Sequence, residues 1–185
     1  MTYAIHPFEY LKALELCATR YSVEVPQEEN STAYWDGVGF KLNNHLFTVD
    51  IGEISEIIPV PQITPLPGVK QWAKGVANIH GRLIPIVDLG SFFGLPRLSR
   101  TNSHRIIVVD QKAVNQKGIS VGLLVDEVHG RQHFPTSDHQ TAPLTGLPDN
   151  ITPYTNGCYQ QDSRHIVFDI DQLVASDVFL AAASE

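Results

Sequence analysis

The sequence Lys74-Gly75-Val76-Ala77-Asn78-Ile79-His80-Gly81-Arg82-Leu83-Ile84-Pro85-Ile86-Val87-Asp88-Leu89-Gly90 decides the fold of this chain. Two short apolar segments, 75–79 and 83–89, flank the dipeptide His80-Gly81. Apolar and β-branched residues on both sides of a glycine-bearing turn predict a β-hairpin. The stretch is too apolar for a solvated loop, so it predicts a surface that binds other proteins and not a catalytic pocket.

Further short apolar segments lie on both sides of this hairpin. They cover residues 37–42, 45–51, 53–60, 104–111, 119–128, 158–160 and 165–170. Asn43-Asn44, between the first two, is a dipeptide that tolerates positive φ and suits a turn. Many short strands at intervals of about 8–12 residues, with little helix, predict a barrel or a sandwich.

The remaining segments predict helices and loops. The apolar spacing over residues 7–20 predicts an amphipathic helix, and a polar linker over 21–35 follows it. Prolines confine 61–68 to an extended loop, and 132–150 is predicted to be a long loop. We expect one helical turn over 91–95 and a closing helix over 169–183.

Composition limits the classes of function. The chain has 185 residues and a formal net charge of −7, with 43% hydrophobic and 18% charged residues. This length fits one domain or two small subdomains. An acidic chain without a basic patch is a poor candidate for binding nucleic acid or anionic membrane surfaces.

Cysteine usage and hydropathy point to a cellular compartment. Cys17 and Cys158 stand in no CxxC pattern, and two isolated thiols suit a reducing cytosol, although a disulfide between them stays open. The sequence has no secretory signal pattern and no stretch of about 20 apolar residues. We therefore expect a cytoplasmic protein with no direct membrane insertion.

The sequence offers no catalytic set and no cofactor motif. It lacks a Gly-x-Ser-x-Gly elbow and phosphate-binding glycine patterns, and burial as a small hydrophobe explains Cys158. An alternative is a metal-binding or small-ligand β protein that uses His129, His133 and His139. On a straight strand His129 and His133 would stand roughly 13 Å apart, which is too far to share one ion. Surface histidines are the simpler interpretation.

Four isoleucines leave one question open. Ile51, Ile54, Ile57 and Ile58 are too many for one buried face of a strand. Either some of them lie at an interface, where an exposed apolar patch marks a partner site, or all belong to the core.

Four blocks of sequence resemble one family. They are 47–57, 75–89, 121–128 and 164–173, and the central block carries the pattern Gly-x-x-Asn-x-x-Gly-x-x-x-Pro-x-x-Asp-Leu. In this order, over residues 37–175, they resemble the CheW coupling proteins of bacterial chemosensory systems. The leader 1–35 resembles the PilI branch of that family, which serves type IV pili and twitching motility.

The resemblance implies an all-β fold of two intertwined five-stranded SH3-like barrels, with a short N-terminal helix and a C-terminal helix. It implies a helical leader and linker over 1–35 and a CheW-like domain over 36–180. It also implies a role: an adaptor, not an enzyme, with no cofactor. Such adaptors bind the regulatory domain of a CheA-type histidine kinase and the cytoplasmic tip of a methyl-accepting chemoreceptor, and so associate with membrane receptor arrays. A third possibility is a fragment of a larger kinase or response regulator. It is disfavoured because the sequence has no receiver or ATP-site motif.

Partner-binding residues follow position by position from the resemblance. Ile54, Glu56, Gly75 and Val128 fall where the family uses partner-surface residues. The chain departs from the family at His80, where Arg is usual, and at Arg131, where an apolar residue is usual. His is mostly neutral near pH 7 whereas Arg is always charged, so Arg82 is expected to supply the charge instead.

Overall fold

The computed structural model describes residues 8, 9, 11, 12, 15, 33–96, 103–111, 119–141 and 146–182. The chain divides into two compact units, Met1–Thr32 and Ala33–Glu185. In the first unit the five described residues are helical, as predicted for 7–20, and the Lys12 Nζ lies 5.6 Å from the centroid of the Phe8 ring. The rest of that helix, Cys17 and residues 21–32 of the predicted linker lie outside the described residues.

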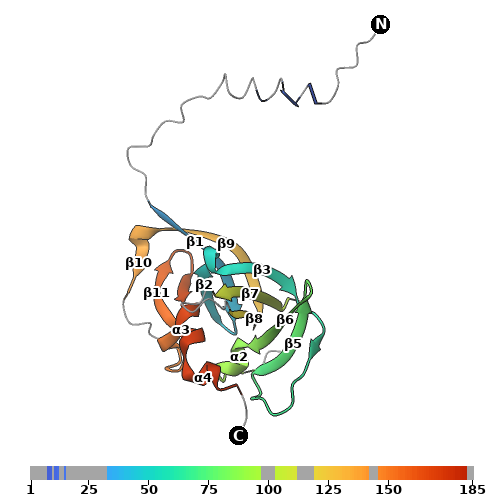
Figure 1. Ribbon diagram of the computed structural model, residues 1–185. Coiled ribbons are helices and arrows are strands. Elements are labelled where there is room, and N and C mark those ends of the chain that lie inside the picture. The colour runs from blue at the N-terminus through green and yellow to red at the C-terminus, as the bar shows by residue number, and fades with distance from the viewer. Residues whose placement is uncertain are drawn as a thin grey trace. The chain divides into compact units, whose positions relative to one another are not determined.

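The second unit is built from two six-stranded sheets (Figure 1). Sheet A has the order β10-β11-β12-β2-β1-β9, with bounds β1 Tyr34–Leu42, β2 His45–Asp50, β9 Glu127–Pro135, β10 His139–Gln140, β11 Thr155–Gln160 and β12 Arg164–Phe168. Sheet B has the order β3-β7-β8-β6-β5-β4, with bounds β3 Ile54–Pro59, β4 Ile63–Thr64, β5 Ala73–Ile79, β6 Arg82–Asp88, β7 Arg105–Gln111 and β8 Ile119–Val125. Because β1 begins at Tyr34, the predicted linker extends two residues too far.

The two halves of the domain have the same connectivity. Each half begins with an antiparallel hairpin, β1–β2 or β7–β8, and its third strand crosses to the other sheet, where β3 pairs with β7 and β9 pairs with β1. Each half closes with a hairpin, β5–β6 or β11–β12, whose last strand runs parallel to β8 or β2. Each sheet therefore contains strands from both halves. The predicted fold of two intertwined barrels is confirmed, with a two-residue strand, β4 or β10, added to five longer ones.

The hairpin that dominates the sequence forms as predicted. Ile79 pairs with Arg82, so two residues make the turn, and His80 and Gly81 have φ angles of 50° and 82°. Positive φ at both central residues defines a type I′ turn, whose twist matches that of the flanking strands. The side chain of Asn78 supports the turn by accepting a hydrogen bond of 2.8 Å from the Gly81 N–H.

A glycine holds the same place in each half. Gly75 in β5 and Gly157 in β11 have φ angles of 127° and 78°, at irregular points of their hairpins. A Cβ at Gly75 would overlap the carbonyl oxygen of Thr64 at the end of β4, and one at Gly157 would overlap that of Gln140 at the end of β10. These two positions require glycine for both backbone conformation and space.

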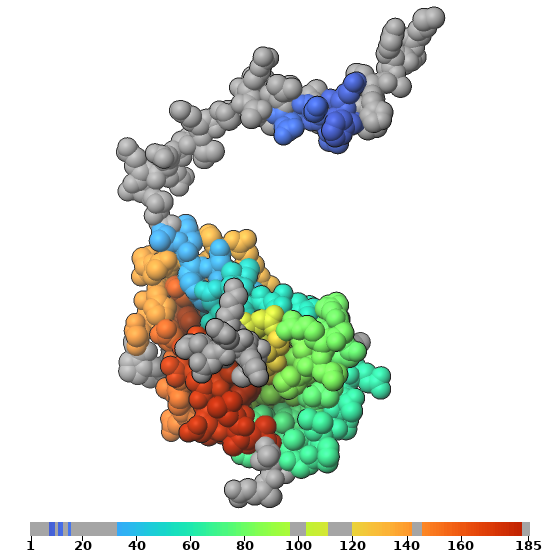
Figure 2. All heavy atoms as spheres, in the orientation of Figure 1, coloured from blue at the N-terminus to red at the C-terminus, as the bar shows by residue number. Residues whose placement is uncertain are grey.

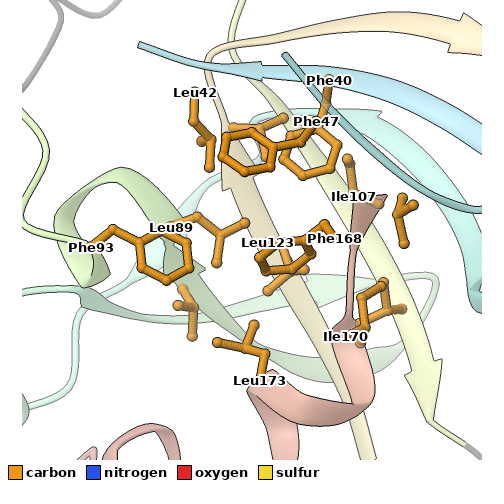
Figure 3. Close-up of a cluster of buried hydrophobic side chains, with 14 of the residues drawn as sticks. Phe40, Leu42, Phe47, Leu89, Phe93, Ile107, Leu123, Phe168, Ile170 and Leu173 are labelled. Carbon is orange, nitrogen blue, oxygen red and sulfur yellow. The ribbon is translucent and has the colours of Figure 1, made fainter. Parts of the chain in front are cut away.

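The large hydrophobic core is shared by the two sheets. Figure 3 shows Phe40, Leu42, Phe47 and Phe168 of sheet A beside Ile107 and Leu123 of sheet B, with Leu89, Phe93, Ile170 and Leu173 completing the cluster. A second, smaller core of Ala77, Ile79, Ile84, Ile86, Ile106 and Val108 fills the inside of sheet B. Strand β7 therefore buries both of its faces, as its unbroken apolar run predicts.

The inside of sheet A has a different composition. Stacked rings of Trp35, Phe134 and Tyr159 occupy it, with centroid distances of 5.4 Å from Trp35 to Tyr159 and 4.5 Å from Phe134 to Tyr159. The Thr48 Oγ1 and the His165 Nδ1 are buried there without a hydrogen-bond partner among the described residues. Burial disfavours the charged imidazole and lowers the pKa of His165.

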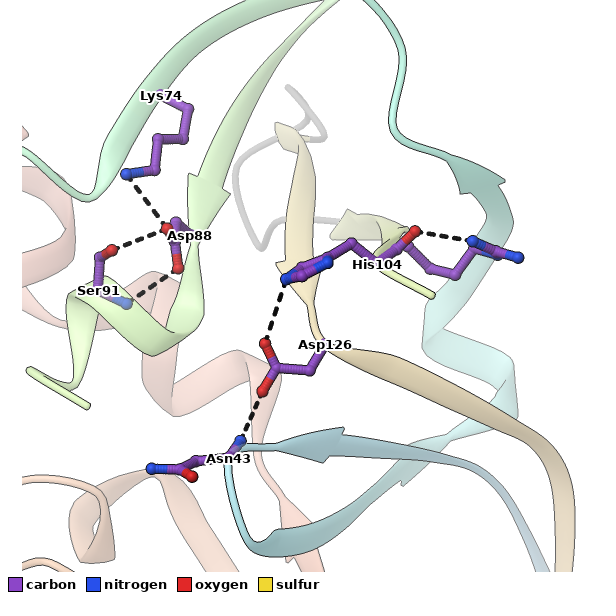
Figure 4. A network of polar contacts seen from close by, with 7 residues as sticks. Asn43, Lys74, Asp88, Ser91, His104 and Asp126 are labelled. Carbon is purple, nitrogen blue, oxygen red and sulfur yellow. Dashed lines mark hydrogen bonds and ion pairs between the residues drawn. The ribbon is translucent and has the colours of Figure 1, made fainter. Parts of the chain in front are cut away.

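The structure corrects a strand and a loop predicted for the second half. The strand expected over 119–128 breaks at Asp126, whose carboxylate accepts a 2.6 Å hydrogen bond from the Asn43 N–H and lies 3.5 Å from His104 (Figure 4). The loop expected over 132–150 is strand up to Pro135 and again in β10, with η2 Thr136–Asp138 between. The alternating burial of β9 is hidden in the sequence because Gly130, at a φ of 77°, shifts its register against β1.

Short helices follow the last strand of each half. In the first half, Asp88 caps α2 Leu89–Phe92 by accepting a 2.9 Å bond from the Ser91 N–H, and the Lys74 Nζ lies 3.1 Å from its carboxylate (Figure 4). In the second half, Asp169 caps α3 Ile170–Ala175. The predicted single helix 169–183 is wrong, because Ser176 ends α3 and its hydroxyl caps a new helix, α4 Asp177–Leu180.

Two further short helical turns, η1 Ile51–Glu53 and η3 Thr152–Tyr154, complete the elements of the second unit. Cys158 is buried and free, as its prediction as a small hydrophobe required. No helix among the described residues has the length and apolar character needed to traverse a bilayer.

Candidate partner-binding surface

The outer face of the β5–β6 hairpin is apolar. Val76 pairs with Pro85 and Asn78 pairs with Leu83 on this face, while the alternate residues enter the core of sheet B. Leu83 is 74% exposed, the highest exposure among the described large hydrophobic residues of the second unit. In Figure 2 the green atoms of this segment lie at the surface. An apolar face on a two-stranded scaffold matches the buried centre of a protein interface.

Two predicted residues meet at the tip of this hairpin. The Nε2 of His80 lies 3.0 Å from the Oε2 of Glu56, which comes from β3. The side chain of His80 is 79% exposed, so the pair contributes little to stability and is accessible to a partner. We call the set Glu56, Val76, His80, Arg82, Leu83 and Pro85 the hairpin surface.

Arg82 provides the fixed positive charge of the hairpin surface. Its Nη2 lies 3.2 Å from the Oδ1 of Asp110 in β7 and also donates to the Ser120 hydroxyl in β8. The Ser120 hydroxyl, and after it Arg82, lower the pKa of Asp110 by donating hydrogen bonds to its carboxylate. Sequence inspection missed Asp110 and Ser120, because the register of three strands brings them to Arg82 and no local pattern marks them.

Three other predicted residues lie away from the exposed surface. Ile54 and Val128 are partly buried and pack against the large core, and Gly75 is buried beneath β4. The four isoleucines divide between the protein surface and the two hydrophobic cores. Ile51 and Ile57 are 41% and 38% exposed, whereas Ile54 and Ile58 pack against the large and the small core.

Arg131 belongs to sheet A, apart from the hairpin surface. Its Nη2 lies 2.7 Å from the Oδ2 of Asp36 in β1, and the same carboxylate contacts the ring of His133. The Tyr34 ring stacks on His133 at a centroid distance of 4.2 Å. Hydrogen bonds from Arg131 and His133 lower the pKa of Asp36. Arg131 is thus engaged by its own neighbours on β1 and β9.

The three histidines of the metal alternative do not converge. His129 lies 3.8 Å from the Glu127 carboxylate, His133 contacts Asp36, and the Nε2 of His139 lies 2.8 Å from the carbonyl oxygen of Asn156. The described residues contain no group of three histidines, cysteines or carboxylates placed to hold one ion. The geometry therefore gives no support to a shared metal site.

Comparison with known proteins gives consistent results. The model of the CheW-like domain matches residues 36–178. Protein PilI of Pseudomonas aeruginosa is 35% identical over 179 residues, which cover 96% of each chain. Chemotaxis protein CheW of Thermotoga maritima is 28% identical over 138 residues, covering 74% of this chain and 85% of the relative.

A solved structure shows the same fold. The scaffolding protein TtCheW from Thermoanaerobacter tengcongensis superposes with a TM-score of 0.63 and 25% sequence identity, covering 74% of this chain and 90% of that one. The family match over residues 36–178 covers most of the second unit.

Proposed function

The chain belongs to the family of CheW-like proteins, and from that premise we propose that it is a non-catalytic adaptor that couples chemoreceptors to a CheA-type histidine kinase. Its relatives carry the names of chemotaxis and scaffolding proteins. The observation that carries the proposal is the hairpin surface, an exposed apolar face bordered by Glu56, His80 and Arg82 on a rigid sheet.

We assign the two partners by their chemistry. A receptor tip presents an amphipathic helix, which docks by its apolar stripe, and the exposed residues Leu83 and Pro85 offer an apolar face for such contact. Charges at the rim set the orientation and the rate of association, which is the role proposed for Glu56, His80 and Arg82. The kinase partner is proposed to contribute its regulatory domain.

The pilus branch is supported by one relative. Protein PilI of Pseudomonas aeruginosa matches this chain along 96% of both lengths, and the match includes the leader. We therefore place the adaptor in a chemosensory system that controls type IV pili and twitching motility. In this role it works in the cytoplasm, held at receptor arrays through its protein partners.

Binding measurements test this proposal. The full chain is titrated with a CheA-type regulatory domain and with a receptor cytoplasmic fragment, using wild type, Glu56→Lys and His80→Glu. We expect wild type to bind both, and each variant to lose at least tenfold in affinity for one partner. Glu127→Lys, on β9 and away from the hairpin surface, is the control for charge. Failure of wild type to bind either partner contradicts the adaptor; unchanged variants contradict the hairpin surface.

A further inference from the structure

A concave site lies in sheet A, away from the hairpin surface. It is a pocket of about 360 Å³ where β2 and β12 end and where η1, η2 and α3 begin. Its lining is Trp35, Asp50, Glu53, Thr136, His139, Asn156, Tyr159, Val167, Phe168, Asp169 and Asp171. Its neighbours β10, β11 and α3 lie together in Figure 1.

The charge of this pocket is one-sided. Four of its lining residues carry carboxylates, and none is a lysine or an arginine. Two of the four are held rigidly: Asp50 accepts bonds of 2.8 Å from the Trp35 indole and 2.7 Å from the Gly52 N–H, and Asp169 accepts 2.8 Å from the Gln172 N–H. Fixed carboxylates keep their charges directed at the pocket without reorganisation.

Glu53 is affected both by its burial and by the negative charges around it. Its partial burial, and after it the charges of Asp171, Asp50 and Asp169, raise its pKa to about 7. A proton on Glu53 therefore partly relieves the repulsion at neutral pH. A bound cation would give the same relief and would release that proton.

One wall of the pocket is aromatic. The Trp35 and Tyr159 rings are nearly parallel, at 16° and 5.4 Å between centroids, and His139 lies 5.1 Å from Tyr159. Behind Trp35, the fully buried Thr48 hydroxyl lacks a partner among the described residues, and its side chain shares a sheet face with the lining residue Val167. A flat aromatic wall beside carboxylates suits a planar cation.

We propose that this pocket binds the guanidinium group of an arginine side chain presented by a protein partner. Arginine is planar, stacks on aromatic rings and forms paired hydrogen bonds with carboxylates, whereas lysine is a compact and strongly hydrated charge. The volume lies at the low end of ligand pockets, which fits one side chain. The inference rests on the proposed adaptor role only in expecting a protein partner.

The two tryptophans make the proposal testable by NMR. The indole N–H of Trp35 faces Asp50 in the pocket, while the buried Trp72 stacks on Phe179 and serves as an internal reference. The full chain is titrated with the capped peptides Gly-Arg-Gly, Gly-Lys-Gly and Gly-citrulline-Gly, and with agmatine. We expect the arginine peptide to shift the Trp35 signal and leave Trp72 unchanged, with at least fivefold weaker binding of the lysine peptide.

Citrulline keeps the shape of arginine without its charge, so an equal response to the citrulline peptide overturns the proposal. If agmatine binds more tightly than the arginine peptide, the ligand of the pocket is a small free amine and not a protein side chain, and the proposal is overturned. We expect Glu53→Gln with Asp171→Asn to weaken the arginine peptide at least fivefold. At pH 8, where Glu53 is mostly ionised, Glu127→Gln with Asp162→Asn changes net charge by nearly the same amount outside the pocket. An equal loss of affinity in that control reduces the effect to unspecific attraction and overturns the site.

Titration with pH gives a second readout. The titratable groups facing Glu53 in the pocket are Asp50, Asp169, Asp171, His139 and Tyr159. Between pH 6 and 8, Glu53 loses its proton, because its pKa is about 7. We expect the affinity for the arginine peptide to rise up to about tenfold over this range and to rise less in Glu53→Gln. An affinity that falls with rising pH contradicts the site, whether or not the kinase and receptor titrations succeed.

Discussion

Sheets A and B have the same connectivity but different interiors. Two cross-strand pairs face the interior of sheet B, Ala77–Ile84 and Val108–Gly122. The equivalent strands of sheet A place Tyr159–His165 and Gly39–Thr48 at the corresponding positions. One interior is aliphatic, whereas the other is aromatic and contains buried polar atoms that have no hydrogen-bond partner in the part of the chain that the structure describes. The hairpins and the two equivalent glycines therefore define the connectivity, and the side chains that fill each interior can differ between the two sheets.

The difference has functional consequences. The closed aliphatic interior of sheet B supports a rigid hairpin whose outer face is available for partners. The larger rings of sheet A form the wall of a pocket bordered by carboxylates. The same architecture thus offers two kinds of surface, one apolar and one anionic.

The largest expected effect tests whether the two interiors behave as one folding unit. Ile106→Ala in sheet B and Phe134→Ala in sheet A should lower the free energy of unfolding by about 3 and about 4 kcal/mol. Because the large core joins both sheets, each variant should still unfold in a single transition. Urea unfolding is followed by fluorescence in Trp72→Phe, which keeps the probe in sheet A, and in Trp35→Phe, which keeps the probe beside sheet B.

Ile106→Val is the matched control, with an expected loss of about 1 kcal/mol. Different urea midpoints for the two fluorescence probes would show that the two sheets unfold separately. The sheets would then be two independent domains and not one folding unit.

The second prediction concerns the equivalent glycines. Gly75→Ala and Gly157→Ala should each destabilise the protein by about 2 to 3 kcal/mol, because the new methyl group meets a carbonyl oxygen and the backbone has positive φ. Gly81→Ala has the same backbone problem in open space and should cost only about 1 kcal/mol. Thermal unfolding checks all three. Unequal effects of the first two would break the equivalence of the halves.

The third prediction uses the pH dependence of Glu53. Its pKa is about 7 in the folded protein against 4.5 for the free side chain, so the folded state binds more protons between these values. Stability from this group is therefore present at low pH and is lost as pH rises towards 7. After allowance for solvent screening, Glu53→Gln should gain about 1 kcal/mol over wild type at pH 8. It should gain nothing at pH 4.

Chemical denaturation at both pH values measures this difference, with Glu127→Gln as the control. A constant difference between wild type and Glu53→Gln would mean that neither burial nor the neighbouring carboxylates raise the pKa of Glu53 in the folded protein.

The smallest expected effect belongs to the exposed tip of sheet B. Glu56→Gln removes the carboxylate that contacts His80, and because His80 is 79% exposed the stability should change by less than about 0.5 kcal/mol. Calorimetry of unfolding measures this, together with the partner titrations described above. A larger loss would make the tip a structural element and not a binding surface.

Local patterns predicted the strands and turns well where the hydrogen bonds are local. The His80-Gly81 turn, the turn at Asn43-Asn44 and the doubly buried run of β7 follow from residue types alone. The loop predicted over 132–150 is wrong at its start. The end of β9 is hidden in the sequence because Gly130 interrupts the alternation and because its partner strand, β1, lies about a hundred residues away. The two-residue strand β10 is defined only by its pairing with β11.

The site was predictable only in part. Glu56, His80 and Arg82 were chosen by resemblance, and the structure brings the first two into contact and fixes the third on Asp110. Ile54, Gly75 and Val128 have structural roles in packing or backbone geometry, which a sequence motif does not distinguish from binding.

The sequence by itself determined the β class, the central hairpin and the family, because turn chemistry and apolar alternation act over a few residues. Only the tertiary structure decided which half contributes each strand, that Glu56 lies at His80, and that four carboxylates surround one aromatic pocket. The physical reason is that sheet register brings together residues far apart in the chain, and its energy lies in long-range hydrogen bonds and in a shared core.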